Sequence, residues 1–280
     1  MSENDASTTE FADHRIAMIG TGVMGEAVLS GIVRSGHQPD RIVVVDANPQ
    51  RLAEVAEKYG VGSATATEAV AGADTVLLAV KPQHMGALLD EITPHLRSQT
   101  LVMSVAAGIT AAYLEAALPE GTPVVRTMPN TPALIGEGMS AVSPGTHANP
   151  AHVREAEELM RASGKVIAVP ESQLDAVTAI SGSGPAYIFY VVEAMIEGGV
   201  LLGMPRPTAT ELVIQTLYGA AGMLTETGEH PTLLRERVSS PGGTTIAALR
   251  QLDENKVRAA FVTAMEAAAR RSAELSSGQL

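Results

Sequence analysis

The sequence predicts an α/β protein in which a doubly wound sheet is followed by an all-α domain. Strand and helix patterns alternate from Arg15 to about Glu171, and only long helical patterns follow. The strands read as nearly continuous apolar runs, which is typical of a parallel sheet covered by helices on both faces. We therefore expect a disordered tail over residues 1–13, a sheet domain over 14–171 and a helical domain over 172–280.

Composition narrows the class of protein. The chain has 280 residues, no Trp, five Tyr and three Phe, so an aliphatic core is expected. It has no Cys, which excludes disulfides and thiolate chemistry and fits a reducing cytoplasm. The formal charge of −12 repels phosphate backbones, so we expect no nucleic-acid partner. We see no signal peptide and no run of 18 apolar residues, and we predict a cytoplasmic protein without a membrane partner.

The elements of the sheet domain follow one another with recognisable boundaries. Apolar strands are expected at 16–19 and 42–45, and a helix at 49–59, where Pro49 suits the first turn and Gly60 suits the end. The remaining predicted elements are a short helix near 67–71, a strand at 75–80, a helix from 82 to about 96, a strand at 100–105, a helix at 111–118, strands at 123–126 and 139–142, a helix at 151–163 and a strand at 165–169.

The second domain is predicted to consist of long helices near 186–202, 208–225 and 256–275. The last has one apolar stripe, whereas the first two are apolar on more than one face. A water-soluble helix of that kind must be buried on several sides. We expect these helices to be covered by a second copy of the chain, with packing on the first domain as the alternative.

The turn of Gly20, Thr21, Gly22, Val23, Met24 and Gly25 lies between the first strand and the first helix. In this context a G-x-G-x-x-G pattern predicts a dinucleotide site of the Rossmann type. The first glycine permits the tight turn, the second admits the pyrophosphate, and the third lets the helix pack on the strand. Asp46 ends the second strand 21 residues beyond Gly25, near the spacing at which an acid meets the adenosine ribose. A glycine turn without a ligand is the alternative.

Ligands of parallel sheets bind beyond the carboxyl ends of the strands. Besides the glycine turn and Asp46, the sequence places three segments there, and we expect each to approach the cofactor. They are Ala79, Val80, Lys81 and Pro82; then Ala106, Ala107 and Gly108; and then residues 127–130, which include Asn130.

The helical domain contains one unusual loop, residues 239–245, which precedes a helical pattern. Its glycines and small hydroxyl residues leave backbone N–H groups free, which predicts an anion site suited to a carboxylate. An ordinary capped loop is the alternative. The cluster at residues 181–185 is interpreted as a feature for close helix packing, with approach of the backbone to the nicotinamide as the alternative.

The chain offers few side chains for acid–base or metal chemistry. None of the seven His forms a metal-like pair, so no metal is expected. An alcohol dehydrogenase needs a His or Lys base, yet the only lysine of the second domain is Lys256, which we assigned to a helix. Reduction of a C=N bond fits better, because a protonated imine needs only a hydrogen-bond partner.

Together these stretches resemble the pyrroline-5-carboxylate reductase family over nearly all of residues 15–275. The resemblance rests on residues 19–25, 79–82, 105–109, 126–132, 181–187 and 238–245. It implies an NADPH- or NADH-dependent oxidoreductase that reduces 1-pyrroline-5-carboxylate to L-proline, the last step of proline biosynthesis. It also implies a homodimer or a higher homo-oligomer such as a decamer.

The resemblance also implies residue roles. Residues 20–25 would bind the pyrophosphate, 79–82 and 106–108 would line the cofactor, and Asn130 would lie near the nicotinamide. Ser240, Gly242, Gly243, Thr244 and Thr245 would hold the substrate carboxylate, and Thr245 would also bond the imine nitrogen as the catalytic residue. Asp46 favours NADH, because a carboxylate repels a 2′-phosphate, although Arg51 offers a phosphate partner.

Two other functions remain open from the residues alone. A β-hydroxyacid dehydrogenase has a similar glycine motif but needs a lysine base on a helix of the second domain. A non-catalytic dinucleotide sensor would bind the cofactor without turnover.

Overall fold

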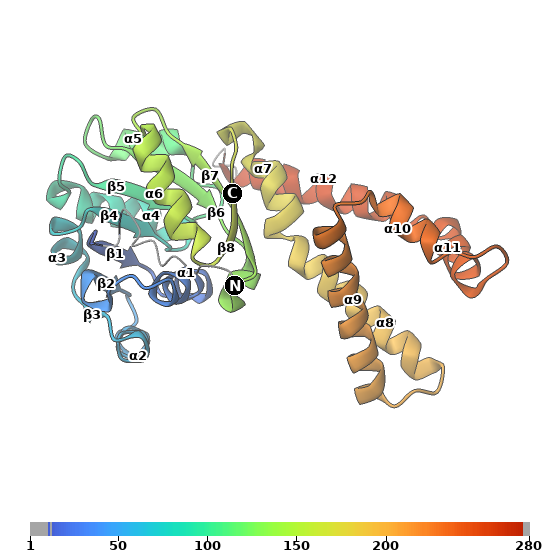
Figure 1. The fold of residues 1–280 in the computed structure, drawn as a ribbon. Helices are drawn as coiled ribbons and strands as arrows, with labels where there is room; N and C mark the ends of the chain where they lie inside the picture. The colour runs from blue at the N-terminus through green and yellow to red at the C-terminus, as the bar shows by residue number, and fades with distance from the viewer. Residues whose placement is uncertain (1–10, 12, 277–280) are drawn as a thin grey trace, which may run out of the picture. The chain divides into compact units, whose positions relative to one another are not determined.

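A computed structural model gives the fold of the chain and describes Phe11 and residues 13–276 (Figure 1). The described residues form two compact units. The sheet unit contains those up to Ser183 and those from Ala268 onward, and the helical unit is Gly184–Ala267. The domain boundary after residue 171 stays a prediction. Most of the predicted tail, residues 1–10 and 12, lies outside the described residues, whereas Phe11 is buried and meets the His14 ring edge-on.

The described part of the sheet unit is built on eight strands in the order β3-β2-β1-β4-β5-β6-β7-β8. Neighbouring strands from β3 to β6 are parallel. The chain leaves β1 for β2 on one side and later returns to β4 on the other side of β1. The boundary between β1 and β4 is therefore the topological switch point. The strands are β1 (Ile16–Ile19), β2 (Ile42–Val45), β3 (Gly62–Ser63), β4 (Thr75–Leu78), β5 (Leu101–Ser104), β6 (Val124–Met128), β7 (Gly138–Pro144) and β8 (Gly164–Ala168).

The sheet is not parallel throughout, which corrects the sequence-based expectation. β7 pairs antiparallel with β6, and β8 then pairs parallel with β7. Residues 129–137, which join β6 to β7, contain only the short 3₁₀ helix η3 (Thr131–Ile135). Because a parallel connection needs a long crossover, this short link requires an antiparallel partner.

Helices cover both faces of the sheet and form two aliphatic cores. One core joins the sheet to α3 (Ala66–Ala71), α4 (Pro82–Ile92) and α5 (Ala111–Ala117). The other joins it to α1 (Val23–Arg34), α2 (Pro49–Tyr59) and α6 (Pro150–Arg161). This arrangement confirms the predicted α/β class, and it explains why the strands are apolar on both faces.

Local signals account for most helix boundaries. Asn48 caps α2 by accepting hydrogen bonds from the N–H groups of Gln50 and Arg51, and Gly60 ends the helix with φ +67. The helix predicted from 82 to about 96 is shorter, because α4 ends at Ile92. Pro94 lies within the following 3₁₀ helix η2 (Thr93–His95), where its ring cannot continue an α-helix.

The chain between the sheet and the helical unit is also helical. The sheet unit contains η4 (Glu171–Gln173), α7 (Leu174–Val177) and the π-helical η5 (Thr178–Gly182). Within η5, a Cβ on Gly182 would lie 2.7 Å from the Met128 Cε, so this glycine allows close packing. The last turns of α12 (Val257–Ser276) belong to the same unit, where the Ser272 hydroxyl donates to Asp175 at 2.6 Å.

The helical unit contains α8 (Gly184–Leu201), α9 (Arg206–Thr227), α10 (Pro231–Arg237), α11 (Thr244–Glu254) and most of α12. The sequence did not predict α10, which begins where the His230 Nδ1 accepts from the Thr232 N–H at 3.2 Å. His230 therefore caps this helix while it stays exposed to solvent. Lys256 was wrongly placed in a helix; it lies between α11 and α12 with φ +57.

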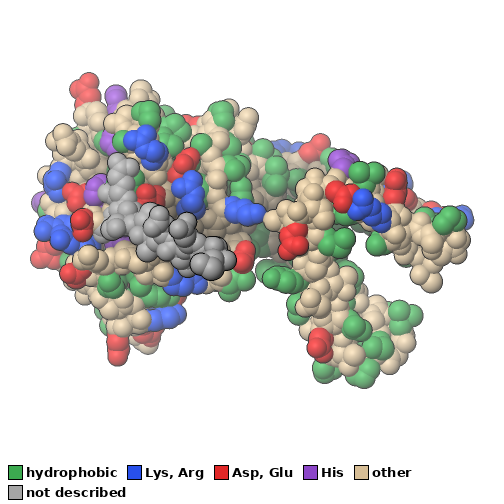
Figure 2. Space-filling model, in the orientation of Figure 1, with side chains coloured by type: hydrophobic (Ala, Val, Ile, Leu, Met, Phe, Trp, Pro, Cys, Tyr) green, Lys and Arg blue, Asp and Glu red, His purple; other side chains and the backbone are tan. Residues whose placement is uncertain are grey.

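One described helical stretch, Glu171–Leu201, is long and apolar enough to cross a membrane by length and composition. Little of it is buried within the single chain. Figure 2 shows many hydrophobic side chains on the surface of the α8 and α9 helices.

Candidate functional site

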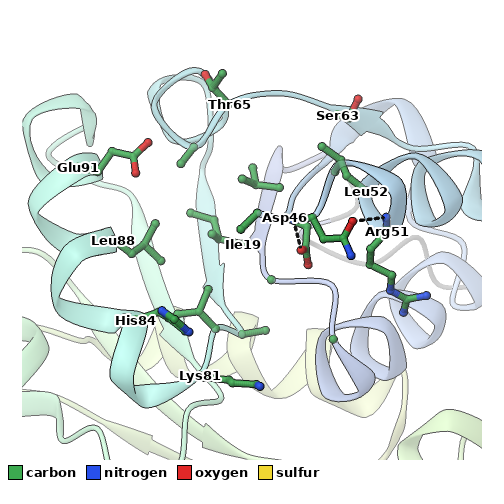
Figure 3. A pocket seen from close by; sticks show the side chains of 18 of the residues that line it. Ile19, Asp46, Arg51, Leu52, Ser63, Thr65, Lys81, His84, Leu88 and Glu91 are labelled. Atoms are coloured by element: carbon green, nitrogen blue, oxygen red, sulfur yellow. Dashed lines mark hydrogen bonds between the residues drawn. The ribbon is translucent and has the colours of Figure 1, made fainter.

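A cavity of about 980 Å³ opens in the sheet unit at the carboxyl ends of β1, β2 and β4. This is the switch point, where an open α/β sheet is expected to bind its ligand. Figure 3 shows Asp46 and Arg51 on one side of the cavity and His84, Leu88 and Glu91 on the other. Its further lining comes from Ile19, Gly20, Gly22, Val45, Ala47, Asn48, Leu52, Ser63, Ala64, Thr65, Ala66, Ala79, Val80, Lys81 and Ala87.

The three glycines of the turn differ in what surrounds them. Gly20 has φ +99, and a Cβ there would lie 2.7 Å from the carbonyl carbon of Ala79. A Cβ on Gly25 would overlap the Gly20 carbonyl oxygen, so this glycine is required for the turn to pack on α1. At Gly22 a Cβ would meet no protein atom within 4 Å. Only Gly22 therefore leaves space for a ligand rather than for the protein.

The Asp46 carboxylate is tied to the glycine turn. Its Oδ2 accepts from the Thr21 N–H at 2.8 Å and from the Thr21 hydroxyl at 2.7 Å, while Oδ1 accepts from the Asn48 N–H at 2.9 Å. Partial burial opposes its ionisation, but the hydrogen bonds from Asn48 and Thr21 outweigh this and lower the Asp46 pKa. Asp46 is thus an ionised side chain held in place by hydrogen bonds. It lines the cavity, and its Oδ1, which accepts one bond, can accept another from a ligand.

Arg51 extends from the first turn of α2 to the same turn. Its Nε donates to the Thr21 carbonyl at 2.9 Å, and its guanidinium pairs with Glu26 of α1. Glu26 also accepts from Lys58 at 2.8 Å and from the Tyr59 hydroxyl at 3.0 Å. The hydrogen bond from Lys58, with those from Arg51 and Tyr59, lowers the Glu26 pKa to about 2 despite its partial burial.

Several predicted cofactor residues line the cavity, and others do not. Gly20, Gly22, Asp46, Ala79, Val80 and Lys81 line it, whereas Thr21, Val23, Met24, Gly25 and Pro82 belong to the adjoining turn and helix starts. Ala106, Ala107, Gly108 and Asn130 are not among its lining residues. The role of these four toward a cofactor stays a prediction.

Asn130 is buried and uses both ends of its amide within the sheet unit. Its Nδ2 donates to the Ser181 carbonyl at 3.1 Å, and its Oδ1 accepts from the Met139 N–H at 2.8 Å. The side chain therefore ties the end of β6 to β7 and to η5. Gly108, with φ +78, approaches Leu275 near the end of α12, where a Cβ would lie 2.9 Å from the Leu275 Cβ.

Sequence reasoning missed part of the cavity wall. Residues 63–66 reach it because β3 adds an edge strand beside β2, and His84, Leu88 and Glu91 reach it from α4. β3 has only two residues, Gly62 and Ser63, too short for a periodic signal. The α4 residues recur at helical spacing and follow Lys81, so helix periodicity would have found them.

The predicted anion loop lies in the helical unit at the start of α11. Gly242 has φ +70, the Gly243 N–H donates to the Ser240 carbonyl at 3.0 Å, and Gly243 is the N-cap of the helix. The N–H groups of the first turn, from Thr244 onward, have no intrahelical acceptor. Ser240, Gly242 and Thr244 are exposed and Thr245 is half-buried, so an anion can reach the helix N-terminus.

The described residues contain no group of three or more His, Cys, Asp or Glu side chains arranged to hold a metal ion. The charged and titratable side chains that line the cavity are instead Asp46, Glu91, Arg51, Lys81 and His84.

The fold and this cavity define a Rossmann-type dinucleotide-binding protein with an added helical unit. A family model described as NADP oxidoreductase, coenzyme F420-dependent, matches residues 15–108, and a model described as pyrroline-5-carboxylate reductase dimerisation matches residues 171–275. A pyrroline-5-carboxylate reductase of Corynebacterium melassecola is 46% identical over 264 residues, which cover 93% of this chain and 98% of that protein. The chain therefore belongs to the pyrroline-5-carboxylate reductase family and is an oxidoreductase.

Solved structures agree with this membership. A pyrroline-5-carboxylate reductase of Coxiella burnetii superposes with a TM-score of 0.88 at 37% identity, covering 94% of this chain and 99% of that one. The Plasmodium falciparum pyrroline carboxylate reductase, solved with NADP bound, gives a TM-score of 0.85 at 27% identity, covering 95% and 99% of the two chains.

Proposed function

We propose that this protein reduces 1-pyrroline-5-carboxylate to L-proline with a nicotinamide dinucleotide as hydride donor, the last step of proline biosynthesis. The observation that carries the proposal is the cavity over the glycine turn, in a chain 46% identical to a pyrroline-5-carboxylate reductase along almost its whole length. The direct test is oxidation of NADH and NADPH in the presence of 1-pyrroline-5-carboxylate. Turnover with 3-oxo acids but not with the imine would contradict it.

The cavity fits a dinucleotide. Gly22 leaves open space at the N-terminus of α1, where free N–H groups and the helix dipole favour the pyrophosphate. We assign the pyrophosphate to residues 20–25, the ribose to Asp46, and the nicotinamide half to residues 79–82 and 106–108. Because the Asn130 amide is already bonded at both ends, we assign it the positioning of this region rather than a direct bond to the nicotinamide.

We propose that NADH is the preferred cofactor. Asp46 is held as a carboxylate at the end of β2, where it accepts from a 2′-hydroxyl and repels a 2′-phosphate. The kcat/KM for NADH should therefore exceed that for NADPH, and Asp46→Ser should narrow the difference. A clear preference of the wild-type enzyme for NADPH would contradict this assignment.

We assign the substrate to the loop of Ser240, Gly242, Gly243, Thr244 and Thr245. When bound, the reduced nicotinamide supplies a hydride for the carbon of the C=N bond. Backbone N–H groups at the start of α11 hold the carboxylate, the Thr245 hydroxyl orients the ring nitrogen, and solvent supplies the proton that this nitrogen gains. Catalysis then rests on positioning and electrostatics.

Thr245→Ala tests the substrate assignment. One hydrogen bond to a charged group contributes about 1.5–3 kcal/mol, so kcat/KM should fall by roughly ten- to 150-fold. Thr245→Ser keeps the hydroxyl and serves as the matched variant, which should retain most of the activity. Equal kinetics of Thr245→Ala and the wild type would remove Thr245 from the mechanism.

We also propose that the protein works in the cytoplasm as a homodimer or as a higher homo-oligomer such as a decamer. The match to a dimerisation model over residues 171–275 and the exposed apolar side chains of α8 and α9 support this assembly. A second copy also accounts for the apolar stretch Glu171–Leu201 without a membrane.

A further inference from the structure

Arg51 stands where a Rossmann protein can bind a 2′-phosphate, yet its guanidinium is already engaged. It follows Asp46 closely at the start of α2 and lines the cavity. An arginine in this region is the usual partner of the extra phosphate of NADP. Here the guanidinium pairs with Glu26, and Figure 3 shows it turned away from the middle of the cavity.

Glu26 is well placed to hold the Arg51 guanidinium in this ion pair. It lies in the first turn of α1, and its side chain is only 14% exposed. Its other partners, Lys58 and Tyr59, lie seven and eight residues beyond Arg51, on the same face of α2. Three donors from one helix therefore converge on a single carboxylate. Its pKa of about 2 means that it stays ionised at any physiological pH.

Moving Arg51 toward the cavity would have a cost. The ion pair with Glu26 would break, and so would the hydrogen bond from the Arg51 Nε to the Thr21 carbonyl. That bond and the two from Thr21 to Asp46 hold the same residue, Thr21. A partly buried pair loses more when one partner leaves than an exposed pair does. The native arrangement therefore favours a ribose without an added phosphate.

We propose that Glu26 is a specificity-determining residue, which selects against a 2′-phosphorylated cofactor by holding Arg51 away from the ribose end of the cavity. Glu26 acts through Arg51 and is therefore a positioning residue. This inference rests on the proposed dinucleotide function and adds a second determinant to Asp46. Three charged residues around the glycine turn then have distinct tasks. Asp46 meets the ribose, Glu26 holds Arg51 away from it, and Lys58 supports Glu26.

The test is the dissociation constant of the purified full-length protein for NADPH and for NADH, measured by titration calorimetry without the imine substrate. Glu26→Gln removes the charge but keeps hydrogen-bonding atoms for Lys58 and Tyr59. A released guanidinium can make charge-assisted bonds to the phosphate, so the Kd for NADPH should fall about ten-fold or more. The Kd for NADH should stay within about two-fold, because NADH offers no such phosphate.

Two variants separate this effect from general electrostatics. Glu54→Gln removes one negative charge from α2. Glu54 bonds to Gln50 and acts on Arg51 through its charge alone, without holding the guanidinium, so the Kd ratio should change little. In the double variant Glu26→Gln/Arg51→Gln the gain for NADPH should disappear. An equal gain in Glu54→Gln, or a gain that persists in the double variant, would overturn the proposal.

Arg51→Gln alone provides a test that does not depend on how Glu26 variants fold. If Glu26 withholds Arg51, this change affects both cofactors alike through the lost bond to Thr21. A Kd for NADPH that rises about ten-fold while that for NADH is unchanged would overturn the proposal. Loss of reductase activity with the imine would count against the proposed function alone, since these constants need no turnover.

Discussion

Gly22 and Gly25 lie three residues apart, and a side chain is disfavoured at each for a different physical reason. Gly25 is buried against the turn that precedes it, where a side chain would overlap the Gly20 carbonyl. Gly22 is exposed and faces open space. The sequence pattern assigns the approach of the pyrophosphate to Gly22 and helix packing to Gly25, and the space around each glycine fits this division.

This difference predicts opposite outcomes for two alanine substitutions. Gly25→Ala should lower the melting temperature markedly, because backbone atoms must move to admit the methyl group. Gly22→Ala should fold with a near-normal melting temperature but bind NADH at least about ten-fold more weakly, since its methyl group occupies the space of the pyrophosphate. Thermal denaturation and NADH titration measure the two effects. Normal NADH affinity in folded Gly22→Ala would contradict the assignment of the pyrophosphate.

The candidate site shows which residue contacts a sequence can reveal. The glycine turn and Asp46 were found because their spacing is set by one strand and one helix. The role of Arg51 was left open, because its partner Glu26 lies 25 residues away on another helix. No local pattern connects those two positions; only the packing of α1 beside α2 does.

At the scale of elements, boundaries follow local chemistry and pairing follows topology. The capped start of α2, and its end at Gly60, were predictable from Pro49 and Gly60. β3, with two residues, and α10, with a histidine cap, carry no strong periodic signal. The reversal of β7 depends on the length of its connection to β6 rather than on its composition, which resembles that of the parallel strands.

The loop after α1 anchors the segment that leads into β1. His37 is buried, and its Nε2 donates to the His14 carbonyl at 2.9 Å. The His14 ring contacts Glu155 of α6 at 2.9 Å. Burial lowers the His37 pKa below 6.5, with the charge of His14 adding to this, although the bond to His14 and the charges of Asp13 and Glu158 oppose it.

This environment predicts a pH-dependent stability. Because the folded state binds the His37 proton less readily than the unfolded state, the stabilisation is present above pH 6.5 and is lost as pH falls through the folded-state pKa. The free energy of unfolding of the wild type, from urea denaturation, should therefore approach that of His37→Gln as the solution is acidified. His95→Gln, at an exposed histidine, is the matched control and should leave the pH dependence unchanged. If the free energies of unfolding of the wild type and of His37→Gln differ by the same amount at every pH, His37 does not cause the pH dependence.

At the scale of the whole molecule, the apolar side chains of α8 and α9 lie largely exposed in the single chain. Within the described residues, α8 has no buried residue, and α9 buries only Ala209 and Val213. The exposed side chains include large apolar groups on both helices: Ile188, Phe189, Tyr190, Leu212, Ile214 and Tyr218. A soluble protein rarely leaves so large an apolar surface in water. The sequence pattern, in which these helices are apolar on more than one face, likewise predicts that they are covered by other protein surface.

The assembly can be broken at this surface without touching the cofactor cavity. Phe189 is 66% exposed in the single chain, and Phe189→Asp would place a charge in the apolar surface that we propose as the contact between copies. Losing the aromatic burial and desolvating the carboxylate should raise the dimer dissociation constant about a hundred-fold or more. Ile135→Asp is the matched control, since Ile135 is 74% exposed but lies in the sheet unit. Sedimentation velocity over a concentration series should show dissociation for Phe189→Asp alone. Equal dissociation of both variants would place the contact elsewhere, whereas NADH binding by a Phe189→Asp monomer would show that the cavity forms within one chain.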